Sequence, residues 1–159
     1  MIAKPILLFL MATGLLLWGK ANGQSNIHPV PSPVFKSLEA AMEKPLEVYR
    51  LSLRRKKLDL FPHEICQFKN LKELDLSKNK LTEIPKEVSQ LKDLQTLNLS
   101  NNKLQFLPAE IGQLQKLDTL IVFKNDLVAL PDEIAHLKSL IYLDMWGNEV
   151  IEIPEGMVK

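Results

Sequence analysis

Leucines and other apolar residues recur along this chain with a strict spacing of 23 positions. From residue 71 to residue 88 the pattern reads Leu-x-x-Leu-x-Leu-x-x-Asn-x-Leu-x-x-Ile-Pro-x-x-Val. The positions one repeat before this segment, and one, two and three repeats after it, also hold apolar residues wherever the pattern has one. Five copies therefore run from about residue 45 to residue 159. Internal repeats of this period indicate a solenoid, in which each copy buries its apolar side against its neighbours.

Each copy predicts one short strand and one turn. In Leu74-Asp75-Leu76 apolar residues alternate with a polar one, which is the period of a β-strand. Adjacent copies place these strands side by side, so we expect a parallel sheet. A proline follows, such as Pro85, and it can begin a short helical turn because the missing N–H would have no partner there.

The repeat resembles the leucine-rich-repeat family, in the subclass whose 23-residue repeats end in Leu-Pro-x-x-Ile. The resemblance covers about 115 of the 159 residues. It implies an α/β solenoid of five repeats, with a parallel sheet on the concave side and short helical or 3-10 turns on the convex side. It is specific for fold but not for function, because members of the family bind many unrelated ligands.

One polar residue recurs inside the apolar pattern, three positions after the second strand leucine. In the family this asparagine turns inward and bonds backbone groups of adjacent coils, as an inward polar side chain must. The first repeat has Lys56 at this place. The expected asparagine ladder consists of Asn79, Asn102, Asn125 and Asn148.

The residues before the repeats predict a linker and a cap. Residues 24–34 contain several prolines and should be an extended linker. Residues 35–44 fit a short amphipathic helix, with Ser37 as its N-cap and Pro45 as its stop. Its apolar side should cover the first repeat through Phe35, Leu38 and Met42. No comparable cap follows the last of the repeats in 45–159, so we expect an uncapped C-terminal end.

The first 23 residues have the features of a secretory signal peptide. Lys4 supplies a positive start, and residues 5–18 form an uncharged apolar run that is short for a membrane span. Ala21 and Gly23 fit cleavage after residue 23. We therefore expect export to the periplasm, the cell surface or the medium, with no stable membrane insertion after cleavage.

Composition narrows the classes of function. The chain is 46% hydrophobic and 25% charged, as expected of a folded domain. A net charge of +1 provides no strong field, so we expect no nucleic-acid ligand. The single cysteine, Cys66, excludes an intramolecular disulfide. The sequence contains no Gly-rich phosphate loop, no nucleophile elbow and no His-Glu-x-x-His motif, so we expect no enzymatic activity, no metal and no cofactor.

Residues that alternate with the strand leucines should face the concave surface. In the middle repeats these are polar, and they include Ser77 and Ser100. The last two repeats instead place apolar and aromatic side chains there, which are enriched at binding hot spots. Packing by loops or by a further repeat would also explain them. The expected partner-binding residues are Thr119, Ile121, Phe123, Tyr142, Asp144 and Trp146.

A second candidate surface is the basic run at residues 54–57. Arg54 and Arg55, with Arg50 on the preceding strand, form a basic patch that could recognise phosphate or an acidic polysaccharide. A solvated loop is the more common explanation of such a run.

These features predict a recognition module that binds a protein or a peptide on the concave face. Two alternatives stay open. The repeats could be the targeting fragment of a larger secreted effector or enzyme. They could also form a self-assembling structural protein that associates through its uncapped C-terminal end.

Overall fold

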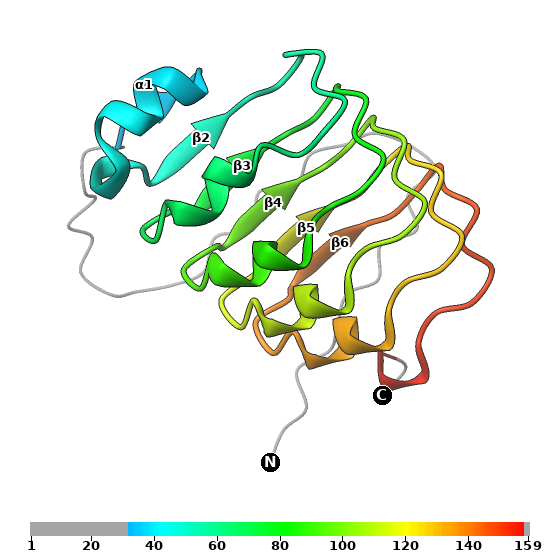
Figure 1. The fold of residues 1–159 in the computed structure, drawn as a ribbon. Helices are drawn as coiled ribbons and strands as arrows, with labels where there is room; N and C mark the ends of the chain where they lie inside the picture. Colours follow the sequence, from blue (N-terminus) through cyan, green and yellow to red (C-terminus); the bar gives the residue numbers. More distant parts are fainter. Residues whose placement is uncertain (1–31, 158–159) are drawn as a thin grey trace, which may run out of the picture.

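The computed structural model of the chain describes residues 32–157, whose backbone winds into a solenoid of stacked coils (Figure 1). Short parallel strands lie side by side in one sheet, in the order β1 to β6, and the 3-10 turns form a second row (Figure 1). The expected α/β solenoid is therefore confirmed. The described part of the sheet has six strands, however, where the repeats alone predicted five.

The strands are very short, and their register follows the repeat. Paired residues in β2 to β6 lie 23 positions apart, as in Arg50 with Glu73 and Thr119 with Tyr142. We number the five repeats as coils 1 to 5 after these strands. The strands are β1 (Val34–Phe35), β2 (Arg50–Ser52), β3 (Glu73–Asp75), β4 (Thr96–Asn98), β5 (Thr119–Ile121) and β6 (Tyr142–Asp144).

The helical segments are also short. A proline lies directly before most of the 3-10 turns, and Pro85 before η3 has a φ of −72°. Within residues 32–157, none of these helices has the length and apolar character needed to cross a bilayer. The segments are α1 (Leu38–Glu43), η1 (Pro45–Glu47), η2 (His63–Gln67), η3 (Lys86–Gln90), η4 (Ala109–Gln113), η5 (Asp132–His136) and η6 (Glu155–Met157).

The N-terminal helix differs from the one expected over 35–44. The Ser37 hydroxyl accepts a hydrogen bond from the Ala40 N–H at 3.3 Å, so Ser37 is the N-cap, and α1 begins only at Leu38. Phe35 was expected in the helix but lies in β1, which pairs with β2. A β-branched and an aromatic residue in sequence favour a strand, and the edge of β2 offers unpaired backbone groups. The expected signal peptide and most of the expected linker lie outside the described residues.

The cap covers the core through a different set of side chains from the one expected. Phe35 and Leu38 pack against the core, and Ala41 is fully buried. Met42 was expected to join them but is 41% exposed. Successive residues of a helix point about 100° apart, so a helix that buries Ala41 turns Met42 toward solvent.

One continuous apolar core fills the solenoid. The central strand leucines, such as Leu74 and Leu97, are at most 1% exposed because coils cover them on both sides. In coil 5, Leu143 and Met145 are only partly buried, whereas their coil 3 equivalents Leu97 and Leu99 are 0% exposed. Burial therefore falls at the end of the described solenoid, where a coil has one neighbour instead of two.

Asparagine side chains join each coil to the preceding one. The Nδ2 of Asn102 donates to the carbonyl of Leu99 in its own coil at 2.8 Å and to that of Leu76 at 3.1 Å. Its Oδ1 accepts from the Leu81 N–H at 3.0 Å. Equivalent sets of three bonds are made by Asn79, Asn125 and Asn148. The amides thus satisfy backbone groups that the turning chain would otherwise leave unbonded inside the protein.

The residue before each ladder position has a left-handed backbone. In coils 1, 2 and 4 it is Arg55, Lys78 or Lys124, with φ between 52° and 58°, and in coil 5 it is Gly147 with a φ of 73°. A non-glycine residue in this region is strained. The conformation turns the chain out of the strand while its N–H still bonds the next coil, as from Lys78 to the Ser100 carbonyl at 2.9 Å.

The ladder yields a stability prediction. Replacing Asn102 by alanine should lower the free energy of unfolding by about 2–3 kcal/mol, because buried backbone groups of two coils lose their partners. Urea denaturation followed by circular dichroism would measure the loss. The neighbouring exposed Lys103→Ala is the control and should change stability by less than about 0.5 kcal/mol. Equal effects of the two substitutions would show that the ladder contributes no stability.

Candidate functional site

The strands place three columns of side chains on the concave face of the sheet. Residues two positions apart in a strand point to the same face. The first and third residues of each strand therefore face the same way as the residue two positions after the strand ends, as Thr119, Ile121 and Phe123 do. Thr119 and Tyr142 are partners across β5 and β6, and so are Ile121 and Asp144. The structure therefore brings these four expected residues together on neighbouring strands.

Two aromatic rings stack at the C-terminal end of this face. The centroids of Phe123 and Trp146 are 5.5 Å apart with an interplanar angle of 17°. Trp146 is 58% exposed, and Tyr142 on β6 is 45% exposed. The Lys124 Nζ lies 5.1 Å from the centroid of the Phe123 ring. We call Phe123, Tyr142 and Trp146 the aromatic end of the concave face.

Asp144 has a structural role that the sequence did not reveal. Its Oδ1 accepts a hydrogen bond from the Trp146 N–H at 3.2 Å. Asp75 and Asn98 make the equivalent bond to the N–H two residues later, at 2.9 and 3.0 Å. Such local bonds fix the turn at the end of a strand. Asp144 therefore holds the backbone that presents the Trp146 ring.

The same carboxylate affects Tyr142. Partial burial raises the pKa of the Tyr142 phenol above its ordinary value, and the negative charge of Asp144 raises it further. Both effects favour the neutral phenol, which can donate one hydrogen bond and accept another at neutral pH.

A hollow of about 260 Å³ lies over the middle of the sheet. Part of its polar lining is bonded within the sheet. The Arg50 Nε donates to Glu73 Oε2 at 2.7 Å, and the Ser52 hydroxyl donates to Asp75 Oδ2 at 3.3 Å. Arg50 was expected in the basic patch, but its guanidinium is engaged in this ion pair. The lining residues include Val34, Arg50, Ser52, Glu73, Asp75, Thr96, Asn98 and Ile121.

Two serines expected on the open surface are buried instead. Ser77 is 1% exposed and Ser100 is 9% exposed. Both share a column with Phe123 and Trp146, but a serine reaches much less far from the backbone than a ring does. The Ser77 hydroxyl has no hydrogen-bond partner within residues 32–157. The open part of this column is therefore confined to its two ends.

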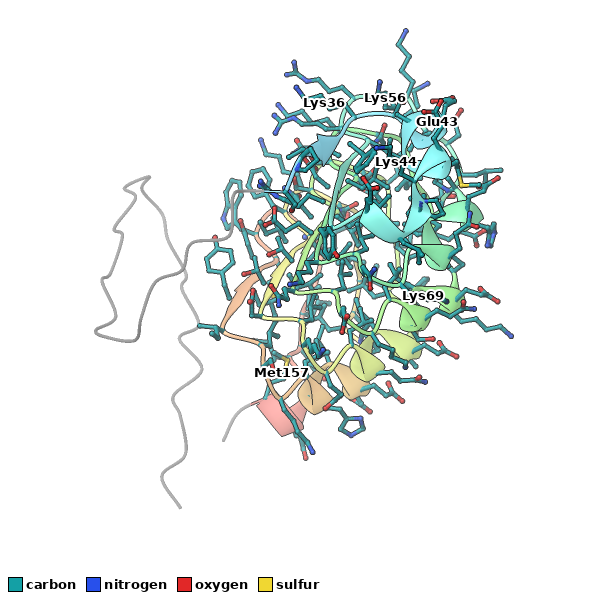
Figure 2. All side chains as sticks on the ribbon, turned by 90° about the vertical axis from the view of Figure 1, so that its left-hand side faces the viewer. Lys36, Glu43, Lys44, Lys56, Lys69 and Met157 are labelled. Atoms are coloured by element: carbon teal, nitrogen blue, oxygen red, sulfur yellow. The ribbon has the colours of Figure 1, made fainter. Side chains whose placement is uncertain are left out.

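The basic run forms the loop after β2. Arg54, Arg55, Lys56 and Lys57 are all exposed. None of them lies within 4.0 Å of an acidic side chain in the part of the chain that the structure describes. In Figure 2, Lys56 and Lys36 lie together at one end of the molecule, and Met157 lies at the opposite end. The basic run and the aromatic end thus belong to opposite ends of the solenoid.

The cysteine has the environment of a core residue. Cys66 is buried, and its thiol is free. Burial raises the pKa of this thiol, and the charge of Glu87 adds to the effect, whereas Lys69 opposes it. A nucleophilic cysteine needs a lowered pKa instead. Among residues 32–157, no three His, Cys, Asp or Glu side chains come together as a metal site would require.

The chain is similar in sequence and in fold to known leucine-rich-repeat proteins. A family profile described as a leucine-rich repeat region matches residues 44–147. A leucine-rich-repeat protein of Leptospira interrogans is 34% identical with a TM-score of 0.51, over 78% of this chain and 43% of that one. The BIR3–SERK2 complex of Arabidopsis thaliana contains a chain that is 33% identical with a TM-score of 0.62, over 69% of this chain and 61% of that one.

A third similar structure is the plant peptide hormone receptor RGFR1 in complex with RGF2, which is 34% identical with a TM-score of 0.52. The match covers 56% of this chain and 15% of the receptor. This chain thus spans less than two thirds of the length of each of these three structures. No curated protein matches the chain.

The environment of Tyr142 gives a prediction about pH. Because its pKa is raised, the phenol should lose its proton above the ordinary value for tyrosine, and folding stability should fall as pH rises through that range. Asp144→Asn should lower the pKa only in part, since burial is the larger cause. Ultraviolet titration of the folded protein, with Tyr142→Phe identifying the signal, would measure both effects. If the Tyr142 titration is unchanged in Asp144→Asn, the Asp144 carboxylate does not contribute to the raised pKa of Tyr142.

Proposed function

We propose that this chain, which belongs to the leucine-rich-repeat family, is a recognition module that binds a protein or a peptide on its concave face. The residues proposed to contact the partner are those of coils 4 and 5. They are Thr119, Ile121, Phe123, Tyr142, Asp144 and Trp146.

The stacked pair of Phe123 and Trp146 is the observation that supports this site most strongly. Fully burying an exposed large apolar side chain contributes about 1.5–3 kcal/mol. Trp146 is exposed and Phe123 is half-buried, so a ligand that covers both rings would gain a part of that contribution from each. Stacking also holds both rings in place before binding, which lowers the entropy lost on association. The concave face of coils 2 and 3 offers polar groups instead, and several of these are bonded within the sheet.

The related structures favour the same class of ligand. One is a peptide hormone receptor in complex with RGF2, and another is a complex between two proteins, BIR3 and SERK2. We extend protein or peptide binding to this chain by that similarity. A catalytic role is no part of the proposal, because neither the sequence motifs nor the environment of Cys66 supports one.

We also propose that the protein acts outside the cytoplasm. The basis is the signal-like sequence of residues 1–23, together with the ectodomain origin of a further similar structure, that of BIR2 from Arabidopsis thaliana.

A capture experiment tests the proposed site. Immobilised wild-type protein and the variant Phe123→Ala/Trp146→Ala would be incubated with an extract of the native host. The variant should lose the partner, because truncating two hot-spot rings costs about 2 kcal/mol or more of binding free energy. Bound proteins would be identified by mass spectrometry, and circular dichroism would establish that the variant is folded.

A matched control variant is Tyr49→Ala/Phe106→Ala. It likewise removes two aromatic rings, which are 36% and 61% exposed and lie on other parts of the surface. It should keep the partner. Capture by all three proteins would place the binding site elsewhere, and loss in both variants would show that the captured partner recognises exposed rings without regard to position.

Self-association through coil 5 is a second candidate function. Ile141 is 71% exposed and Ile151 is 91% exposed, although side chains of this kind are usually buried. If a second copy covers them, sedimentation velocity should show a concentration-dependent increase in mass. The variant Ile141→Ser/Ile151→Ser should then remain monomeric. A wild-type protein that is monomeric at every concentration would eliminate this function and leave the recognition module unaffected.

A further inference from the structure

A row of cations follows the edge of the solenoid where the chain leaves the strands. The row contains eight Lys and Arg residues from coils 1 to 4, and the side chains of all eight are exposed. Only Lys80 has an acidic partner within 4.0 Å among residues 32–157, the carboxylate of Asp59 at 3.9 Å. We call this set the basic rim. It consists of Arg54, Arg55, Lys56, Lys57, Lys78, Lys80, Lys103 and Lys124.

The repeat aligns these cations along the solenoid. Lys57, Lys80 and Lys103 occupy one position in coils 1, 2 and 3, because they lie 23 residues apart. Neighbouring strands are about 4.8 Å apart, so coils 1 to 4 carry charge along a track about 14 Å long. In coils 4 and 5 the same position holds Asp126 and Glu149. The basic track therefore has a direction, from coil 4 back to coil 1.

Part of the rim is built at an energetic cost. Arg55, Lys78 and Lys124 occupy the left-handed position of their coils, with φ values of 58°, 57° and 52°. Coil 3 has the uncharged Asn101 at this position, with a φ of 55°. Glycine adopts this conformation without strain and stands there in coil 5. Long cationic side chains thus stand at a position where the backbone alone favours glycine.

The rim meets the aromatic end at Lys124. Its Nζ lies 5.1 Å from the centroid of the Phe123 ring, and that ring stacks on Trp146. A ligand that covers the two rings therefore lies beside the first cation of the track. The apolar anchor site and the basic rim therefore adjoin each other at Lys124.

We propose that the ligand of the concave face carries a short acidic segment beside its apolar anchor, and that the basic rim binds this segment. The inference rests on the proposed function, because it assumes that the aromatic end receives the anchor. An extended peptide advances about 3.3 Å per residue, so four or five residues span the track. The ligand motif is then one apolar residue followed by a run of Asp and Glu that extends toward coil 1.

The attraction between the basic rim and an acidic segment is the sum of several weak contacts. A single exposed ion pair contributes little, but a row of like charges attracts an oppositely charged segment from a distance and accelerates association. Salt screens such contacts over about 8 Å at physiological ionic strength. Binding should therefore weaken as salt is added, and more so in the wild type than in a protein whose rim has lost charge.

The test uses a phage-displayed library of random twelve-residue peptides selected on the purified protein. Peptides that bind should contain an aromatic or aliphatic residue with several acidic residues within the next four or five positions. The rim variant Lys80→Glu/Lys103→Glu should still select the apolar residue but lose the acidic run. It should bind the best wild-type peptide about tenfold more weakly in fluorescence anisotropy.

A matched variant controls for net charge. Lys86→Glu/Lys138→Glu makes the same change of charge at two exposed lysines outside the basic rim. It should select the same peptides as the wild type and bind them within about twofold. If both charge variants lose the acidic run, the preference reflects overall charge, and the role of the rim is wrong.

The outcomes separate the two proposals. Peptides that depend on Phe123 and Trp146 but carry no acidic run would overturn the further inference and leave the proposed function standing. Acidic peptides that bind equally to Phe123→Ala/Trp146→Ala would contradict both, since no anchor would then adjoin the rim. Selection of no peptide at all would also contradict both. Tighter binding of a sulfated polysaccharide or a single-stranded oligonucleotide than of the best peptide would assign the rim to another class of polyanion.

Discussion

Each coil of this protein depends on the next one for both its apolar burial and its hydrogen bonds. A single coil has an apolar interior that only a neighbouring coil can cover, and backbone groups that only a neighbour can bond. The amide of Asn102 makes this dependence explicit, because it serves carbonyls of two coils and an N–H of the earlier one. Stability is therefore a property of interfaces between coils, and a fully buried leucine such as Leu97 exists only because coils lie on both sides of it.

This constraint leaves the outward residues free to serve binding. The repeat fixes the leucines and the asparagine, whereas several positions between them on the concave face, such as 121, 142 and 146, are at least partly open to solvent and tolerate varied side chains. The same column can hold Ser100 in coil 3 and Phe123 in coil 4 without disturbing the sheet register. The exposed rings of coil 5 are therefore not required by the repeat itself. Asp75, Asn98 and Asp144 are exceptions, because each fixes the turn after its strand.

The sequence predicted the features that repeat and missed several that do not. Strand positions, the inward asparagines and the cap at Ser37 all follow from spacing or from local chemistry. Strand β1 occurs once and contains two residues, so no periodicity could signal it. The pairing of Arg50 with Glu73 and the burial of Ser77 depend on side-chain lengths in adjacent coils, which a one-dimensional pattern does not describe. Whether the aromatic end binds a partner is likewise a question that spacing cannot answer.

The stacked rings also connect two units of the solenoid that differ in how firmly they are held. Phe123 comes from coil 4, whose core is covered on both sides, and Trp146 from coil 5, where Leu143 and Met145 are only partly buried. Local opening begins where contacts are fewest, so coil 5 is the part of the described solenoid that should separate most readily. A ligand that grips both rings would fasten coil 5 to coil 4. The observed affinity would then be lower than the intrinsic affinity, because part of the binding free energy would hold coil 5 against coil 4. Mutations in the coil 5 core would therefore weaken binding although these residues do not contact the ligand.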